Sequence, residues 1–368
     1  MIPIYQPYLT SENLQYAHKA LDSGWISSQG EYLDLAKDSL KSTIEYNNHK
    51  IILTNNGTSA THLMALALRY KYPNIKKIIV PNNVYVAAWN SFLYTHQYEL
   101  IAIDANLETW NFEESYIENL LDKSTAILVV HNIGNIVNIP KLKSKFPDTV
   151  ILEDNCEGFL GQYENLPTGS ESFASSISFF GNKTLTSGEG GAFITKDTDV
   201  FSHINMVKNQ GQSDTKFIHA TLGYNYRMTN VQAAILYGQL QDLNFITEQK
   251  QNIFNQYKKI LQNIPSIKFQ SIDSSTKHSN WMFGIRITNL NLKKKKELEL
   301  YLFESGIDTR PMFYDIHQHP YLGNIKSIKN TNAQILQNQC LMLPSYPTLN
   351  KSQISYICDK LITFIHKI

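Results

Sequence analysis

A single lysine, Lys183, lies in the stretch SFFGNKTLTSGEGG, which is rich in glycine and hydroxylated residues. A lysine in such a stretch can hold a phosphate, or it can act as a nucleophile that carries a cofactor. A phosphate-binding loop needs the motif GxxxxGK[ST] between a strand and a helix. Here Asn182 separates Gly181 from the lysine, Ser176 stands where the earlier glycine is needed, and the stretch continues into the strand-like GAFIT. The spacing excludes the phosphate loop and leaves a nucleophile or an ordinary surface lysine.

A lysine that forms a Schiff base with pyridoxal phosphate needs an acid at the pyridine nitrogen, amides and hydroxyls for the phosphate, and usually an aromatic ring on the cofactor face. Asp154 ends the strand-like TVILED, 29 residues before Lys183. Ligands bind at such carboxyl ends in open α/β sheets. Gly57-Thr58 follows the strand-like IILT and opens a helix, whose free amides bind phosphate. Ser178 can add a hydroxyl and Tyr85 an aromatic ring. Taken singly, each also fits a plain role as a cap, an ion-pair partner or a core residue.

The bulk composition excludes several classes of protein. The chain has 368 residues, 42% hydrophobic and 18% charged, with a net charge of +1. This is a globular composition, and it points away from nucleic acid or an anionic membrane as the main partner. Three cysteines without CxxC spacing argue against a disulfide framework or a zinc site. We find no signal peptide and no apolar run long enough to span a membrane, so we expect a cytoplasmic protein.

Two histidines, His317 and His319, form the motif HQH, but no third ligand is evident nearby. Zinc sites need three or four protein ligands, so we expect no metal here. A structural role or a contact with substrate is the preferred interpretation of this motif.

The fold class follows from the alternation of short apolar runs with helical segments from about residue 50 onward. Strand-like runs such as KIIVP, ELIAIDA and AILVVHN are divided by helical segments of ten or more residues. This pattern predicts an α/β fold with a mainly parallel sheet covered by helices on both faces. Near Thr229 the pattern changes to a long helical stretch that runs to about Leu261, introduced by the capping box TNVQ. We therefore predict a large domain over 1–245 and a smaller α+β domain over 246–368.

The motifs together resemble the DegT/DnrJ/EryC1/StrS family of sugar aminotransferases, which are fold-type I enzymes that use pyridoxal 5′-phosphate. The resemblance covers nearly the whole chain, through LDSGWISSQGEYL, NNGTSATHLMALAL, LEDNCEG, SFFGNKTLTSGEGGAFITKD, GYNYRMTNVQAAI and GIDTRPMFYDIHQHPYL. The lysine motif and GYNYRM are its most specific parts. Within the family, the motifs are most similar to those of enzymes that aminate C4 of a nucleotide-linked 4-keto-6-deoxyhexose, of the perosamine or viosamine type.

The resemblance also implies roles for individual residues. Lys183 forms the Schiff base, Asp154 pairs with the pyridine nitrogen, and Glu157 reaches the ring hydroxyl, where many family members have glutamine. The remaining cofactor contacts implied are Gly57, Thr58 and Ser178 at the phosphate, Tyr85 on the ring, and Asn225 at the phosphate of the neighbouring subunit's cofactor. Weaker candidates near the sugar nucleotide are Arg227, Arg310, Tyr314 and His317. The role of Asn225 implies an obligate homodimer, or a larger assembly, with composite active sites.

The expected reaction is a ping-pong transamination with L-glutamate as amino donor and a nucleotide-linked 4-keto-6-deoxy sugar as acceptor. Two alternatives stay open: amination at C3 of the sugar or of a cyclitol, and a catalytically inactive regulatory or binding homologue. Related dehydratases carry histidine in place of the lysine, so the presence of Lys183 favours transamination. The sequence does not distinguish UDP, dTDP and GDP, or the gluco and manno configurations.

Overall fold

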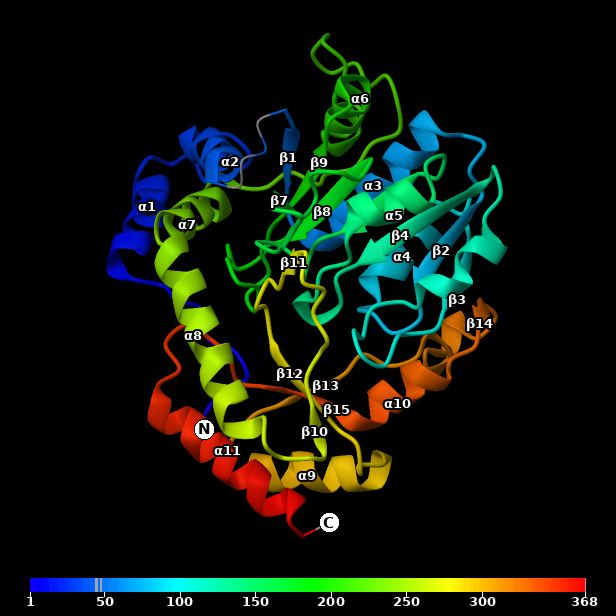
Figure 1. The fold of residues 1–368 in the computed structure, drawn as a ribbon. Helices are drawn as coiled ribbons and strands as arrows, with labels where there is room; N and C mark the ends of the chain where they lie inside the picture. Colours follow the sequence, from blue (N-terminus) through cyan, green and yellow to red (C-terminus); the bar gives the residue numbers. More distant parts are fainter. Residues whose placement is uncertain (44–45, 47, 368) are drawn as a thin grey trace.

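The computed structural model describes residues 1–43, 46 and 48–367. Its largest feature is an eight-stranded sheet in the order β1-β9-β8-β5-β4-β2-β3-β14 (Figure 1). All neighbours in this sheet are parallel except β9, which is antiparallel to both β1 and β8. The strands are β1 (Lys50–Thr54), β2 (Lys77–Pro81), β3 (Glu99–Ile103), β4 (Thr125–Val130), β5 (Ile151–Asp154), β8 (Ala174–Ser178), β9 (Gly191–Thr195) and β14 (Lys326–Ile328).

Helices cover both faces of this sheet, as the sequence predicts. One face packs against α3 (Gly57–Lys71), α4 (Ala87–Leu93) and α6 (Thr198–Lys208). The other packs against α2 (Glu31–Thr43), α5 (Ile139–Lys145) and α7 (Asn230–Gln241), with α1 (Ser11–Asp22) beside α7. The strand-like runs from IILT to GAFIT all form strands of the sheet, so the prediction of a mainly parallel α/β fold is confirmed. Among the described residues, no helix is both long and apolar enough to cross a membrane.

The helical stretch predicted from Thr229 to Leu261 is two helices rather than one. The capping box is present, with the Thr229 and Gln232 side chains each bonded to the other's backbone amide. Helix α7 ends at Gln241, because the next residue, Asp242, has a φ of −96° and a ψ of 12° outside the helical region, and α8 (Leu243–Leu261) follows directly. Asn13 donates a hydrogen bond of 2.9 Å to the Asp242 carboxylate, so a contact with α1 holds the break in place.

A second core lies beneath the large sheet, where α8 leads in Figure 1. Its four-stranded antiparallel sheet has the order β10-β12-β15-β13. Its elements are β10 (Ile267–Lys268), β12 (Phe283–Ile287), α9 (Leu292–Glu304), β13 (Arg310–Pro311), α10 (Thr331–Gln339), β15 (Cys340–Leu343) and α11 (Lys351–Ile365). Between β13 and α10 the chain returns to the large sheet and adds β14 beside β3. A small third sheet joins β6 (Gln162–Tyr163), β7 (Leu166–Pro167) and β11 (Thr276–Lys277). The division at residues 245 and 246 stays a prediction.

Candidate active site

The carboxyl ends of β1, β5 and β8 lie at one edge of the large sheet, since these strands run in the same direction. A cavity of about 650 Å³ opens at this edge, between the large sheet and the second core. Most residues that the sequence singled out line it: Gly57, Thr58, Tyr85, Asp154, Glu157, Ser178, Lys183, Arg310 and Tyr314. Residues up to 257 positions apart in the chain (57 to 314) therefore meet in one cavity. Such an arrangement is the usual setting of a ligand site in an open α/β fold.

Two side-chain hydrogen bonds fix the backbone at Lys183. The Tyr5 hydroxyl donates to the Lys183 carbonyl at 2.5 Å, and the Trp281 indole Nε1 donates to the preceding Asn182 carbonyl at 3.0 Å. The Lys183 Nζ lies 3.9 Å from the centroid of the Trp281 ring. A cation over an indole face gains about 0.5–2 kcal/mol, so the indole favours a defined place for the free ammonium.

Trp281 is a site residue that the sequence analysis missed. Its side chain is 5% exposed in the structure. The Lys250 ammonium, itself buried in α8, donates to the Trp281 carbonyl at 2.6 Å, and burial lowers the pKa of this lysine to about 7. No local motif predicts the contact with Lys183, because the two residues are 98 positions apart in the chain.

Asp154 is the last residue of β5 and is 6% exposed. Its Oδ1 accepts hydrogen bonds from the Cys156 amide at 3.1 Å and from the Ser176 hydroxyl at 3.4 Å. These donors stabilise the ionised carboxylate and fix its orientation at the cavity wall. A carboxylate held in this way suits the protonated nitrogen of a heteroaromatic ring.

Glu157 lines the cavity from the turn that follows β5. Its Oε2 accepts from the Ile133 amide at 2.8 Å, and its carbonyl accepts from the Ser279 hydroxyl at 2.6 Å. Burial raises the pKa of the Glu157 carboxyl to about 7, although the charge of Lys183 and the Ile133 amide act in the opposite direction. This carboxyl therefore exchanges a proton near neutral pH, which a glutamine at the same place cannot do.

A narrow cradle forms where α3 begins, opposite the end of β8. The Asn56 side chain accepts from the Ser59 amide at 2.8 Å, and the Asn56 carbonyl accepts from the Ala60 amide at 3.3 Å. The earlier amides of α3 have no intrahelical carbonyl partner, which suits them to a phosphate. A Cβ on Gly57 would lie 2.6 Å from the Ser178 Cβ, so only glycine allows this approach. The donor set, the cradle and the lysine fit pyridoxal phosphate.

Three predicted residues do not line this cavity. The Asn225 side chain is exposed, and its backbone bridges to Asn209. Arg227 donates from Nε to the Ser28 hydroxyl at 3.1 Å and lines a separate cavity of about 460 Å³. His317 lies outside the lining, whereas His319 lies within it, at 5.6 Å between ring centroids from Trp89. The roles predicted for Asn225, Arg227 and His317 stay predictions.

Among the described residues, no group of three or more His, Cys, Asp or Glu side chains is arranged to hold a metal ion. The cysteines Cys156, Cys340 and Cys358 are free. Burial raises the pKa of the Cys156 thiol, so this cysteine beside the cavity is not an activated thiolate.

The sheet topology and the lysine cavity define a fold-type I, pyridoxal-phosphate-dependent enzyme. Comparison with known proteins makes the assignment specific. The model of the DegT/DnrJ/EryC1/StrS aminotransferase family matches residues 7–362, and the chain belongs to this family. Its cofactor is pyridoxal phosphate, and it is a sugar aminotransferase.

Two curated relatives match along almost their whole length. The chain is 34% identical over 372 residues to the GDP-perosamine synthase of Escherichia coli O157:H7, covering 99% of this chain and 98% of that protein. It is 29% identical to the GDP-perosamine synthase of Vibrio cholerae, with 98% of each chain covered. Among solved structures, the Helicobacter pylori aminotransferase PseC, involved in pseudoaminic acid biosynthesis, has a TM-score of 0.92 at 22% identity, with 100% of both chains covered. That structural likeness supports the fold.

We predict that Gly57→Ala weakens cofactor binding by about tenfold or more and destabilises the fold by about 1–3 kcal/mol, because the new methyl group overlaps Ser178. Equilibrium dialysis with pyridoxal phosphate and thermal melting measure the two effects. Gly181→Ala is the matched control, since a Cβ there meets only the Gly188 carbonyl, at 3.9 Å. Equal affinities for the two variants would contradict the cradle.

We predict a pH-dependent stability difference between the cofactor-free wild type and Glu157→Gln. The folded-state pKa of about 7 lies above the ordinary value of 4.5. Stability from the protonated carboxyl is therefore complete below pH 4.5 and is lost as the pH rises through 7. Relative to wild type, Glu157→Gln gains on the order of 3 kcal/mol across this window. Denaturant unfolding at pH 4.5, 6 and 8 measures it, and a constant difference would refute the raised pKa.

Proposed function

We propose that the chain transfers the amino group of L-glutamate to C4 of GDP-4-keto-6-deoxymannose, giving GDP-perosamine. The observation that carries the proposal is Lys183, placed in the cavity with Asp154, in a chain that matches GDP-perosamine synthases over almost its full length. These relatives also favour GDP over UDP and dTDP, and the manno over the gluco configuration, which the sequence alone left open. The presence of both Lys183 and Asp154 argues against an inactive regulatory homologue.

The bound cofactor supplies an electron sink that stabilises negative charge at the carbon attached to the transferred nitrogen. Asp154 would hold its pyridine nitrogen protonated, Gly57, Thr58 and Ser178 its phosphate, and Tyr85 one face of its ring. With the cofactor bound, the Lys183 amine would remove the proton from Cα of glutamate; the nitrogen would stay on the cofactor, and water would supply the keto oxygen of 2-oxoglutarate. In the second half-reaction the same amine returns a proton to C4 of the sugar. Glu157 exchanges a proton beside the cofactor ring, and the Trp281 indole holds the lysine between these steps.

Chemistry at C3 of the sugar is the second candidate. A GDP-4-keto-6-deoxy-D-mannose-3-dehydratase from E. coli with bound hydrated PLP has a TM-score of 0.88 at 21% identity, and it covers 98% of this chain. A sugar turned by one position in the same cavity would present C3 to Lys183. The lysine itself favours amino transfer over dehydration, and the C4 reaction is the one named in the more similar relatives.

We further propose a homodimer in which Asn225 reaches the partner's cofactor phosphate. The flanking Tyr224 and Tyr226 rings stack at 4.9 Å, and the Tyr226 hydroxyl hydrogen-bonds His62 at 3.0 Å, so this segment is fixed while Asn225 itself is exposed. On the preceding loop Phe217 is 77% exposed and Leu222 is 81% exposed. Exposed apolar side chains of this size mark an interaction surface, and a second copy of the chain fits it. The free cysteines and the nucleotide-sugar substrate support a cytoplasmic location.

The function is tested with 4-keto-6-deoxyhexoses linked to GDP, UDP and dTDP, each with L-glutamate. We expect amination of the GDP-mannose derivative, with kcat/KM at least about a hundredfold above the other two, because a site that hydrogen-bonds guanine rejects bases that lack its donors and acceptors. NMR of the product determines whether the nitrogen is on C4. A product aminated at C3 would replace the leading proposal by amination at that carbon, and release of a sugar without nitrogen would exclude amino transfer at either carbon.

The composite site is tested by mixing Lys183→Ala with Asn225→Ala subunits after reversible dissociation. Each variant alone is expected to lose nearly all activity, Lys183→Ala because it lacks the proton carrier. In a mixed dimer one of the two sites combines an intact lysine with an intact partner asparagine, so the mixture regains about a quarter of wild-type activity. Asn244→Ala, an exposed residue at the start of α8, serves in place of Asn225→Ala as the control subunit. No regain in the mixture would show that Asn225 does not act across subunits.

A further inference from the structure

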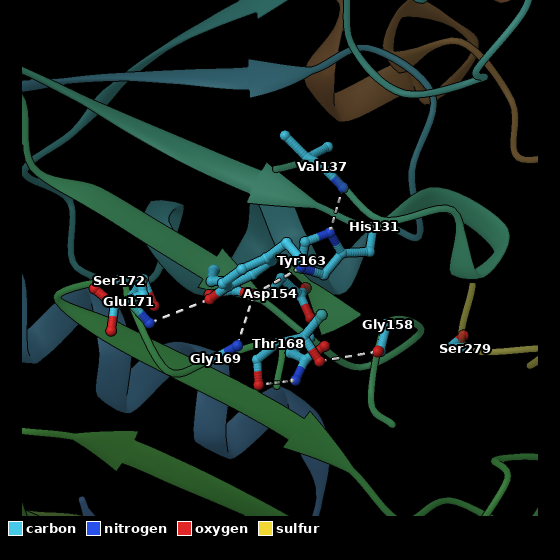
Figure 2. Close-up of polar contacts among 12 residues, drawn as sticks. His131, Val137, Asp154, Gly158, Tyr163, Thr168, Gly169, Glu171, Ser172 and Ser279 are labelled. Atoms are coloured by element: carbon cyan, nitrogen blue, oxygen red, sulfur yellow. Dashed lines mark hydrogen bonds and ion pairs between the residues drawn. The ribbon is translucent and has the colours of Figure 1, made fainter. Parts of the chain in front are cut away.

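A polar network lies fully buried behind the cavity, formed by His131, Glu153 and Tyr163. Figure 2 labels His131 and Tyr163 of this network. His131 follows β4, and Glu153 is the neighbour of Asp154 in β5. Adjacent residues of a strand point to opposite faces of the sheet, so Glu153 points away from the cavity that Asp154 lines. The proposed chemistry does not use this network directly.

The hydrogen bonds define where the proton of His131 lies. The Val137 amide donates to His131 Nδ1 at 3.1 Å, so Nδ1 carries no proton. The proton is therefore on Nε2, which donates to Glu153 Oε1 at 2.7 Å. The same carboxylate also accepts from the Gly169 amide at 2.7 Å and from the Tyr163 hydroxyl at 3.5 Å. The imidazole is neutral, and both of its nitrogens are engaged.

The bonds of the His131 ring to the Val137 amide and to Glu153 together hold the loop 131–137 in place, and we call this pair of bonds the clamp. One end of the loop continues from β4, and the other is bonded through the Val137 amide to the His131 ring. Inside the loop, the Gly134 amide donates to the His131 carbonyl at 2.9 Å, and Ile133 adopts a left-handed φ of 55°. This conformation costs a β-branched residue energy, so the surrounding bonds must impose it.

The loop is the element that holds the carboxylate of Glu157. The Ile133 amide, in its strained conformation, donates to Glu157 Oε2 at 2.8 Å. The His131 ring also packs against Gly158, where an added Cβ would lie 2.3 Å from His131 Cδ2. His131 therefore contacts two neighbours of Glu157. One is the loop 131–137, which donates a hydrogen bond to the Glu157 carboxylate, and the other is Gly158, the next residue in the chain.

We propose that His131, through its bond to the Val137 amide, is a positioning residue that presents Glu157 to the cofactor ring. The proposal rests on the proposed function in one respect, that Glu157 faces the ring. Besides its own loop, the charged groups acting on Glu157 are Lys183 and Asp154. A displaced Glu157 would change the protonation of the bound cofactor, an effect that general loss of stability does not produce.

Two substitutions each remove one of the two bonds of the clamp and keep the other. The side-chain oxygen of His131→Asn occupies the place of Nδ1 and can accept from the Val137 amide, but this variant lacks the donor to Glu153. The side-chain amide of His131→Gln reaches the place of Nε2 and can donate to Glu153, but this variant leaves the Val137 amide without its acceptor. Both variants keep a polar side chain of similar size.

The primary readout is the absorbance of bound pyridoxal phosphate titrated with pH, together with its dissociation constant. We expect His131→Gln to raise the dissociation constant about tenfold and to move the titration midpoint toward that of Glu157→Gln. His131→Asn should stay within about threefold of wild type in affinity, with little change in the midpoint, although it melts at a lower temperature because Glu153 loses a donor. In the Glu157→Gln background, His131→Gln should shift the midpoint no further.

Tyr163→Phe is the matched control, because it removes another contact of the same buried carboxylate without touching the loop 131–137. It should lower the melting temperature and leave the midpoint unchanged. A wild-type midpoint and affinity in His131→Gln, or equal midpoint shifts in His131→Gln and Tyr163→Phe, would overturn the proposal. A wild-type protein that binds no pyridoxal phosphate would instead overturn the proposed function, so the two failures are distinguishable.

Discussion

The close approach of the Gly57 backbone to Ser178 is the constraint on which the site depends. It joins the start of α3 to the end of β8, and an ideal Cβ on Gly57 would overlap the serine side chain. The stretch that follows Ser178 carries Lys183, and the strand beside β8 carries Asp154. The spacing of two neighbouring strands thus sets where Gly57, Lys183 and Asp154 lie relative to one another. The residues of the cavity therefore come from the same stretch of chain, residues 7–362, that matches the family.

The electrostatics of the cavity follow from burial combined with a few fixed donors. Asp154 receives two hydrogen bonds from its neighbours, whereas Glu157 is held by one amide, and burial raises its pKa to about 7. Two carboxyl groups three positions apart therefore have different surroundings, which supports the different roles proposed for them. The Lys183 Nζ lies over the Trp281 indole, at 3.9 Å from the ring centroid.

The sequence predicts the parts of the site that local motifs encode. Lys183, Asp154 and Gly57 each end or begin a predicted element, so their meeting at one sheet edge follows from the direction of parallel strands. Trp281 was not predicted as a cavity residue, because its contact with Lys183 joins two parts of the chain that lie far apart in sequence. Likewise, the helix break at Asp242 depends on Asn13, more than 200 residues away in the chain. The strand β14 was missed because three residues are too few for a periodic pattern to be recognised.

The indole of Trp281 has a consequence for how this protein can be observed. A tryptophan 3.9 Å from the reactive amine is a natural fluorophore at the place where the cofactor binds, and three other tryptophans serve as an internal background. Because the lysine ammonium lies over the indole ring, we expect the emission of Trp281 to change when the lysine becomes engaged. Since the Trp281 carbonyl is bonded to Lys250 of α8, the same signal also reports how closely the second core is seated against the sheet.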